Sequence, residues 1–283
     1  MTEIAVVILS FNGRDTTLRC LRTVAAQEGV DFGVLLWDNG STDGTAEAVR
    51  DEFPDTIVHA HRSNLGVAGG RNAAADMAIE TFEPDYLLFL DNDLELREGF
   101  IQAMRGPFDS DDRLAQTQAK LLFSHDPERL NDGGGCRIQF WLGRTQPVGY
   151  GEIDRGQYDR PARCVAGGGA MMVRTEVFRR LAGFDEAFSP TGPEDLDFSL
   201  RAHAAGYHAV FVPAAVAYHT PSHTRPAGYS PVLRVSHWAE FCRRHAGPAQ
   251  RVGFLLFGAP LMYARTHIAL WLRSRQTGTR VQE

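Results

Sequence analysis

Tyr86-Leu87-Leu88-Phe89-Leu90-Asp91-Asn92-Asp93 is the stretch of sequence that decides the fold. Its apolar run predicts a strand that is buried on both faces, as in a parallel sheet. Two carboxylates, one residue apart, then stand at the carboxyl end of the strand, where open α/β sheets bind their ligands. Carboxylate oxygens suit Mg²⁺ or Mn²⁺. The alternative is an Asx-rich turn that only closes the strand.

Strands and helices alternate through the first half of the chain. Apolar runs predict strands at residues 4–9, 34–37, 57–58 and 86–90, and helical spacing predicts helices at residues 16–26, 45–52 and 71–79. This alternation favours an α/β fold with a doubly wound, mostly parallel sheet. Strand-like pieces at 115–123, 136–141 and 210–212 and helical ones at 175–181 and 195–205 predict that the second half extends the same sheet.

Composition limits the class of protein. The chain has 283 residues, of which 43% are hydrophobic and 23% charged, as in a soluble globular protein with one large domain or a domain plus an appendage. The start of the chain does not resemble a signal peptide, and the four cysteines have no zinc or redox spacing. We therefore expect reduced thiols and a cytoplasmic location.

Charge is distributed unevenly along the chain. The net charge is −6, but residues 225–283 contain nine arginines against two glutamates. This tail therefore carries +7 and the rest of the chain −13. An acidic body is a poor partner for nucleic acid, which we exclude, and the basic tail requires a local explanation.

Several polar loops follow the predicted strands of the first half. They comprise residues 10–13, 38–43 and 64–72, and a parallel sheet would bring them to the edge that carries Asp91 and Asp93. The glycine-rich loop leads into a helix, whose N-terminus could face a phosphate. It lacks the Gly-x-Gly-x-x-Gly spacing of dinucleotide-binding proteins, which argues against a Rossmann oxidoreductase.

Two later features add chemistry. Glu194 and Asp195 stand at the start of a helical pattern, where Asp195 is either a helix cap or a general base. His219 follows an apolar stretch and is either a structural residue or a ligand of a carboxylate-bound metal.

The ordered set of these motifs resembles the inverting glycosyltransferases of family 2, which have the nucleotide-sugar-binding GT-A fold. The resemblance covers residues 3–222, and the closest branch is that of the rhamnosyltransferase-like and galactofuranosyltransferase-like enzymes. Its landmarks are Val7 to Asn12, Asp38 to Thr45, Asn64 to Gly66 with Arg71-Asn72, Asp91 to Asp93, Gly183 to Glu186, Glu194-Asp195 and His219.

The resemblance implies a role for each motif. Asp38 would bind the pyrimidine base of the donor, and Asp91 would contact the ribose or the metal. Asp93 would ligate the divalent ion, Mn²⁺ or Mg²⁺, and His219 would be a further ligand of the metal or of the diphosphate. The remaining donor-binding candidates are Ser10, Phe11, Asn12, Asn64, Gly66, Asn92 and, beside the diphosphate, Arg71.

Catalysis and partners follow from the same resemblance. Asp195 would be the catalytic base, and Glu194 would orient the acceptor or the base. The expected donor is a UDP- or dTDP-sugar, with dTDP-rhamnose as one candidate. The acceptor would be a saccharide or a lipid-linked molecule of cell-surface polysaccharide synthesis. The alternatives are a nucleotidyltransferase and a non-catalytic nucleotide-sugar-binding protein of similar fold.

The tail divides the chain into residues 1–222, the transferase domain, and residues 223–283, a helical segment. Residues 252–264 form an uncharged run of thirteen residues, shorter than the roughly 20 that cross a bilayer. We predict either helices packed on the body or an interfacial amphipathic segment whose arginines meet anionic lipid head groups. The second interpretation places the protein peripherally on the inner face of the cell membrane.

Overall fold

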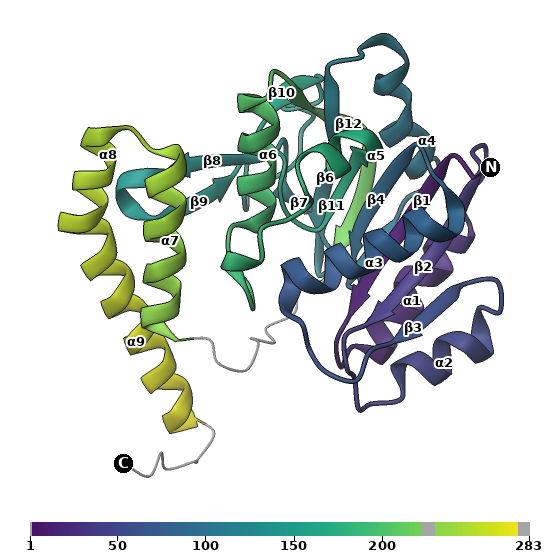
Figure 1. The fold of residues 1–283 in the computed structure, drawn as a ribbon, viewed down its shortest axis with the longest axis horizontal. Helices are drawn as coiled ribbons and strands as arrows, with labels where there is room; N and C mark the ends of the chain where they lie inside the picture. Colours follow the sequence, from purple (N-terminus) through teal and green to yellow (C-terminus); the bar gives the residue numbers. More distant parts are fainter. Residues whose placement is uncertain (1, 222–229, 277–283) are drawn as a thin grey trace.

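The computed structural model describes residues 2–221 and 230–276. A ten-stranded sheet forms the centre of the molecule, with the main strand order β10-β12-β6-β11-β4-β1-β2-β3 (Figure 1). The strands are β1 (Ile4–Ser10), β2 (Phe32–Asp38), β3 (Ile57–Ala60), β4 (Tyr86–Asp91), β5 (Leu94–Leu96), β6 (Leu114–Phe123), β7 (Asp126–Asp132), β10 (Ala162–Cys164), β11 (Ala170–Arg174) and β12 (His208–His219).

Helices cover both faces of this sheet. They are α1 (Arg14–Ala25), α2 (Thr45–Glu52), α3 (Gly66–Phe82), α4 (Phe100–Arg105), α5 (Thr175–Arg180) and α6 (Glu194–Ala204). Short 3-10 turns, η1 (Gly106–Ser110) and η3 (Glu186–Phe188), join some of these elements.

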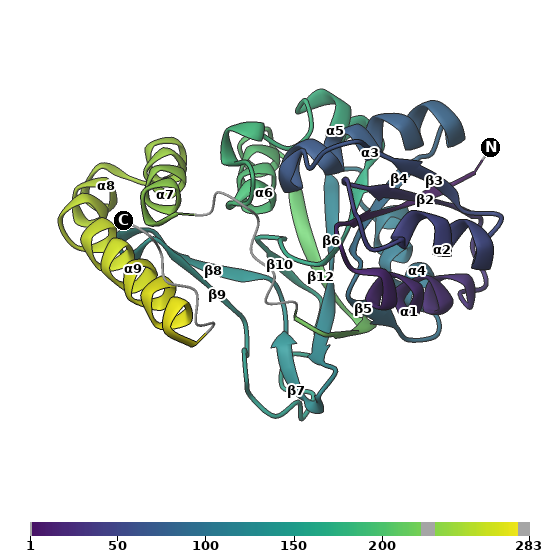
Figure 2. The same ribbon diagram turned by 90° about the horizontal axis from the view of Figure 1, so that it is seen from below.

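Successive residues of β1 point to opposite faces of the sheet, as the pleat requires. Ile4, Val6 and Ile8 pack in the core that also contains residues of α1, α2 and α4. Ala5 and Val7 pack in a second core with residues of α3, α5 and α6. The two helix layers lie on opposite sides of the sheet in Figure 2. The apolar runs in the sequence therefore reflect burial on both faces.

The predicted α/β fold with a central sheet is confirmed, and the sheet mixes parallel and antiparallel pairs. β3, β2, β1 and β4 are parallel neighbours, and β6 and β12 are also parallel to each other. The intervening β11 is antiparallel to both β4 and β6. The second half of the chain therefore extends the first-half sheet, as the sequence predicts for residues 115–123 and 210–212. The strand-like piece predicted at 136–141 lies instead outside this sheet, in a separate two-stranded hairpin.

The third helix begins earlier than the sequence predicts. Glycines suggested a turn before residue 71, but α3 starts at Gly66 and includes Gly69 and Gly70. The helix lies so close to β1 that a Cβ on Gly70 would stand 2.6 Å from Leu9 Cδ1. The glycines therefore permit close packing of a helix on the sheet instead of interrupting it.

The C-terminal helices and a β-hairpin form a smaller lobe, at the end of the molecule opposite β3 (Figures 1 and 2). The hairpin pairs β8 (Cys136–Gln139) with β9 (Arg144–Pro147), joined by η2 (Phe140–Leu142). The helices are α7 (Pro231–His245), α8 (Pro248–Gly253), the π-helical η4 (Phe254–Gly258) and α9 (Ala259–Gln276). No helix among the described residues combines the length and apolar character needed to cross a bilayer.

This lobe is packed against the body, as one of the two interpretations of the tail predicts. Phe241 and Phe254 share an apolar core with Phe188 and Leu196 of the sheet domain. The core also takes in Phe140 from the hairpin. Apolar burial therefore joins the tail to residues that precede position 222.

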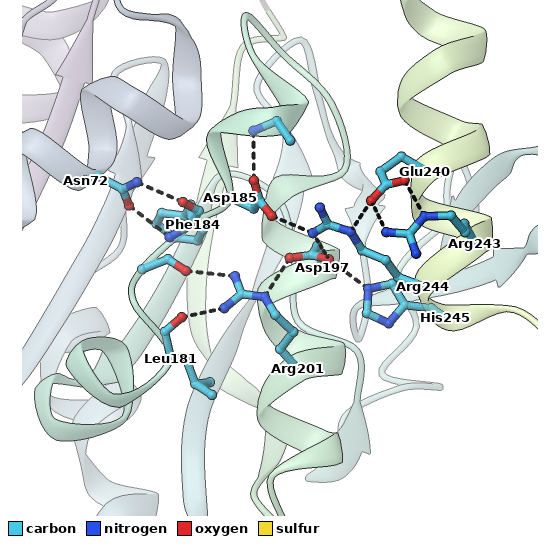
Figure 3. Close-up of polar contacts among 12 residues, drawn as sticks. Asn72, Leu181, Phe184, Asp185, Asp197, Arg201, Glu240, Arg243, Arg244 and His245 are labelled. Carbon is cyan, nitrogen blue, oxygen red and sulfur yellow. Dashed lines mark hydrogen bonds and ion pairs between the residues drawn. The ribbon is translucent and has the colours of Figure 1, made fainter.

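A buried carboxylate adds a polar tie between α6 and α7 (Figure 3). Asp197 is fully buried and accepts hydrogen bonds from Arg201 Nε at 2.7 Å and from His245 Nε2 at 2.8 Å. Arg244 lies 3.4 Å away and also pairs with Asp185. Burial raises the pKa of Asp197, but these hydrogen bonds outweigh it and lower the pKa below its ordinary value. Arg244, one of the nine arginines of the tail, is therefore bound to the body.

Candidate functional site

The predicted metal ligands Asp93 and His219 lie together. Antiparallel pairing of β5 with the end of β12 places His219 opposite Leu94, beside the turn that carries Asp93. His219 Nε2 is 3.3 Å from Asp93 Oδ1, and its Nδ1 is 2.9 Å from Asn131 Oδ1. Burial lowers the pKa of His219, but the hydrogen bond and charge of Asp93 outweigh it and raise the pKa.

The chemistry of this pair fits a divalent ion. Bonds of about 2.1 Å around an octahedral ion leave adjacent ligand atoms about 3 Å apart, close to the observed separation. Among residues 2–221 and 230–276, no three His, Cys, Asp or Glu side chains gather closely enough to enclose an ion. Mg²⁺ and Mn²⁺ sites that handle nucleotides commonly take one or two protein ligands and complete their shell with phosphate and water.

Asp91 faces a buried arginine. Arg71 Nη2 lies 2.6 Å from Asp91 Oδ1, and Arg71 Nη1 lies 3.9 Å from Glu194 Oε1. Arg71 is 5% exposed and Glu194 4% exposed, so the guanidinium balances charge where water screens little. Arg71 therefore links the β4 terminus to the acidic cluster of α6.

A glycine loop separates Asp91 from Asp195. A Cβ on Gly169 would stand 3.0 Å from Asp91 Oδ2, and one on Gly167 would stand 3.1 Å from Asp195 Oδ2. The N–H of Gly168 donates to Asp195 Oδ2. The backbone thus passes so close to both carboxylates that side chains at Gly167 and Gly169 would crowd them. The glycine run in the sequence did not by itself reveal this role.

Burial raises the pKa of both Glu194 and Asp195. Backbone hydrogen bonds oppose this effect at Asp195, which accepts from Leu196 N–H at 2.7 Å as well as from Gly168. A carboxylate has further lone pairs, so Asp195 can still receive a proton. Asp197, the third acidic residue of α6, is committed to the contacts with Arg201 and His245.

A cavity of about 190 Å³ lies at the carboxyl ends of β1 and β4. It is lined by six of the residues predicted to bind the donor or the metal and by four others that were not predicted site residues. The predicted ones are Phe11, Asn64, Gly66, Asp91, Asn92 and Asp93, and the others are Leu9, Asn39, Val67 and Pro190.

Three other donor candidates hold the loops around this cavity. Ser10 is buried and accepts a hydrogen bond from Asn92 Nδ2 at 3.2 Å. Asn12 Oδ1 accepts from Thr42 N–H at 2.8 Å, which joins the loops after β1 and β2. Asp38 is 3% exposed and accepts from Ser41 N–H at 2.8 Å. Ser10 and Asn12 thus join neighbouring loops, and Asp38 closes its own loop.

Asn39 organises the loop that begins α3. Its Nδ2 donates to Asn64 Oδ1 at 3.0 Å, and its Oδ1 accepts from Leu65 N–H at 3.0 Å. Gly66 has a φ of +77°, and a Cβ there would stand 2.8 Å from Pro190 Cα. The conformation therefore requires glycine at this corner, and the Asp38-Asn39-Gly40 turn signal was the clue to Asn39.

A second cavity, of about 380 Å³, contains Asp195. Gly168, residues 191–193 and Leu196 line it beside Asp195. Its other walls come from the hairpin, through Cys136, Arg144 and Thr145, and from α7, through Arg234, His237 and Trp238. The sequence predicts the C-terminal segment as an appendage, whereas the structure places part of it beside the predicted base.

Comparison with known proteins identifies the family. Residues 5–181 match the model of the family Glycosyl transferase family 2, and residues 153–273 match the model of Glycosyl transferase family group 2. The chain is 26% identical over 271 residues to N-acetylglucosaminyl-diphospho-decaprenol L-rhamnosyltransferase of Mycobacterium tuberculosis, covering 87% of each chain. It is 27% identical to the O-antigen biosynthesis protein RfbC of Myxococcus xanthus, over 83% of this chain and 18% of that protein.

Solved structures show the same fold. GalNAc-T7 with UDP, GalNAc and Mn²⁺ aligns with a TM-score of 0.68 and 17% identity, over 86% of this chain and 48% of the other. A mannosyltransferase from Pyrobaculum calidifontis with GDP-Man and Mn²⁺ aligns with a TM-score of 0.58 and 16% identity, over 98% and 76%. The family match covers more than half of the chain, which decides against a nucleotidyltransferase and a non-catalytic binding protein. The chain therefore belongs to glycosyl transferase family 2 and is a glycosyltransferase with the GT-A fold.

Proposed function

We propose that the enzyme transfers a sugar from a nucleoside diphosphate sugar to a hydroxyl of a lipid-linked saccharide, with inversion at the anomeric carbon. The observation that carries this proposal is a pair of cavities near the Gly167–Gly169 loop, whose backbone runs close to both Asp91 and Asp195. One contains Asp91 and Asp93, and the other contains Asp195. The mycobacterial relative, a rhamnosyltransferase by name, supports dTDP-rhamnose as the first donor to test among UDP- and dTDP-sugars.

The donor would occupy the cavity at the ends of β1 and β4. Asp93 and His219 would hold Mn²⁺ or Mg²⁺, and the bound ion would offset the charge that develops on the leaving diphosphate. Arg71 holds the Asp91 carboxylate in place. The Asn39 contacts fix the loop that faces the donor.

Asp195 would act as the general base on the acceptor. It takes the proton of the acceptor hydroxyl while that oxygen forms a bond to the anomeric carbon. The bond from the same carbon to the diphosphate oxygen breaks on the opposite face, and the nucleoside diphosphate leaves with its electron pair. One displacement inverts the configuration, and Glu194, held by Arg71 and by the Gly192 N–H, orients the base.

The acceptor would enter the larger cavity. Arg144 and Arg234 line it, and in the described part of the chain their guanidiniums bond Gln139 and Thr266 instead of carboxylates. A cationic wall suits a phosphate group of a lipid-linked acceptor. The same acceptor class places the enzyme at the cytoplasmic face of the membrane as a peripheral protein.

A transfer assay tests this function. Calorimetry with UDP-, dTDP- and GDP-sugars in Mn²⁺ or Mg²⁺ selects the donor, and NMR of the product determines the anomeric configuration. We expect metal-dependent binding of a pyrimidine nucleotide sugar and an inverted product. Retained configuration would contradict the single-displacement role of Asp195, and metal-independent binding would contradict the site at Asp93 and His219.

A further inference from the structure

We infer that the outer face of α8, η4 and α9 is a docking surface for an anionic lipid bilayer. This docking face consists of Val252, Leu255, Leu256, Phe257, Leu261 and Ile268. The inference extends the proposed site of action by naming the surface that meets the membrane. It can be tested by membrane binding without any transfer reaction.

Apolar exposure is concentrated on this segment. Among the described residues, eight of the fourteen exposed large hydrophobic side chains lie between positions 252 and 271. Leu255, Leu256 and Phe257 are consecutive and are each 63–64% exposed. Contiguous exposure of this kind marks an interaction site, because scattered single residues are the rule elsewhere on soluble proteins.

The helix geometry explains how one segment can have two apolar faces. Phe254, Gly258, Met262 and Thr266 recur every fourth residue and are buried against the body. A Cβ on Gly258 would stand 2.5 Å from the Trp141 carbonyl oxygen, so this face is in close contact with η2. Phe257, Leu261, Ala264 and Ile268 recur at intervals of four, three and four residues and are exposed. The buried face anchors the segment while the exposed face has the spacing of an amphipathic helix.

Charge identifies the occupant of the docking face. The 42 residues between Glu240 and Glu283 contain seven arginines and no acidic residue. Arg251, Arg265 and His267 are exposed beside the apolar residues, and α9 also carries Arg273 and Arg275. An apolar face on a segment that carries cations and no acidic residue matches the anionic head groups and acyl boundary of a bilayer.

A second copy of the chain is a weaker candidate for this face. In a symmetric dimer the same patch meets itself, so the arginines of α9 would lie near their own copies without a compensating carboxylate. Docking on a bilayer also has a functional consequence. α9 packs on α7, with Arg234 Nη1 3.3 Å from Thr266 Oγ1, and Arg234 lines the cavity that contains Asp195. The acceptor cavity would therefore lie about one helix diameter, 10–12 Å, from the lipid surface.

Co-sedimentation of the full chain with lipid vesicles tests the inference. We expect binding to mixed phosphatidylglycerol–phosphatidylcholine vesicles and weak binding to pure phosphatidylcholine. The triple variant Leu256→Gln/Phe257→Gln/Ile268→Gln should bind about 100-fold more weakly, because each side chain loses its apolar transfer energy. Arg265→Gln/Arg273→Gln/Arg275→Gln should lose about fivefold in affinity per arginine, only with anionic vesicles.

Matched controls separate a local effect from a global one. Tyr150→Gln/Ile153→Gln removes exposed apolar residues elsewhere, and Arg155→Gln/Arg160→Gln/Arg163→Gln removes three exposed arginines of the body. Both should bind vesicles like the wild type, and every variant should keep its nucleotide affinity. A wild type that does not bind vesicles, or test variants that bind as well as the controls, would overturn the inference. A dimer by analytical ultracentrifugation that only the apolar triple variant dissociates, without vesicle binding, would assign the face to a second copy.

Discussion

His219 Nε2 lies 3.3 Å from Asp93 Oδ1, although the two residues are far apart in the sequence. Two interactions produce this proximity. Antiparallel pairing of β5 with β12 places His219 opposite Leu94, and the Thr220 N–H donates to the Asp93 carbonyl oxygen at 3.0 Å. The candidate metal site is thus built on sheet hydrogen bonds, which hold it more rigidly than a free loop would.

Asp93→Asn should abolish metal-dependent binding of the nucleoside diphosphate. The substitution removes a charged ligand, so we expect a loss in affinity of at least about 100-fold. Calorimetry with UDP and dTDP, with and without Mn²⁺, measures it. Asp112→Asn, which neutralises an exposed carboxylate of the body, is the matched control and should bind normally. Wild-type affinity in Asp93→Asn would remove Asp93 from the metal site.

Asp195→Asn should keep donor binding and lose transfer. The general base acts on the acceptor, so its removal lowers kcat by about 10²–10⁴ and leaves the donor dissociation constant unchanged. Steady-state kinetics and donor calorimetry on the same preparation separate the two effects. Near-normal turnover would reassign the base, with Glu194 as the next candidate because Asp197 is fully buried and paired.

As pH is lowered, the rate of transfer should begin to fall at a higher pH than it would with a general base of ordinary aspartate pKa. A base works only when deprotonated, and burial raises the pKa of Asp195 above the ordinary value of about 3.9. The acidic limb of kcat/KM against pH should therefore lie above that value. Circular dichroism over the same pH range controls for unfolding. A rate that stays constant down to about pH 4 would contradict the raised pKa.

Asp197→Ala should weaken the contact between α6 of the sheet domain and α7 of the smaller lobe. The substitution leaves Arg201 and His245 without their buried partner, and breaking a buried pair of this kind costs about 3–5 kcal/mol. The lowered pKa of Asp197 means that its contribution is present above the ordinary pKa and lost as pH falls through the lowered value. Urea unfolding measures the change in the free energy of unfolding. Arg243→Gln, at an exposed pair with Glu240, is the control and should leave the free energy of unfolding close to the wild-type value.

Much of the fold and part of the site could be predicted from local patterns. The apolar runs at residues 4–9 and 86–90 correspond to β1 and β4 because burial on both faces leaves a continuous signal. Parallel topology then brings the loops after β1 and β2 to the Asp91–Asp93 turn, and six predicted residues do line one cavity. The predicted start of α3 at residue 71 was wrong, because close packing of its glycines against β1 outweighs their low helix propensity.

The sequence by itself determined the order of strands and helices from β1 to β4, the acidic turn after β4 and the basic, partly apolar tail, because each depends on residues that are neighbours in the chain. Only the tertiary structure decided which distant groups meet. It placed Arg71 between Asp91 and Glu194, passed the Gly167–Gly169 backbone between two carboxylates, and set α7 residues around the cavity of Asp195. It also divided the tail into a buried and an exposed apolar face. The physical reason is that long-range pairing and helix packing fix these contacts, and neither leaves a periodic signal in the local sequence.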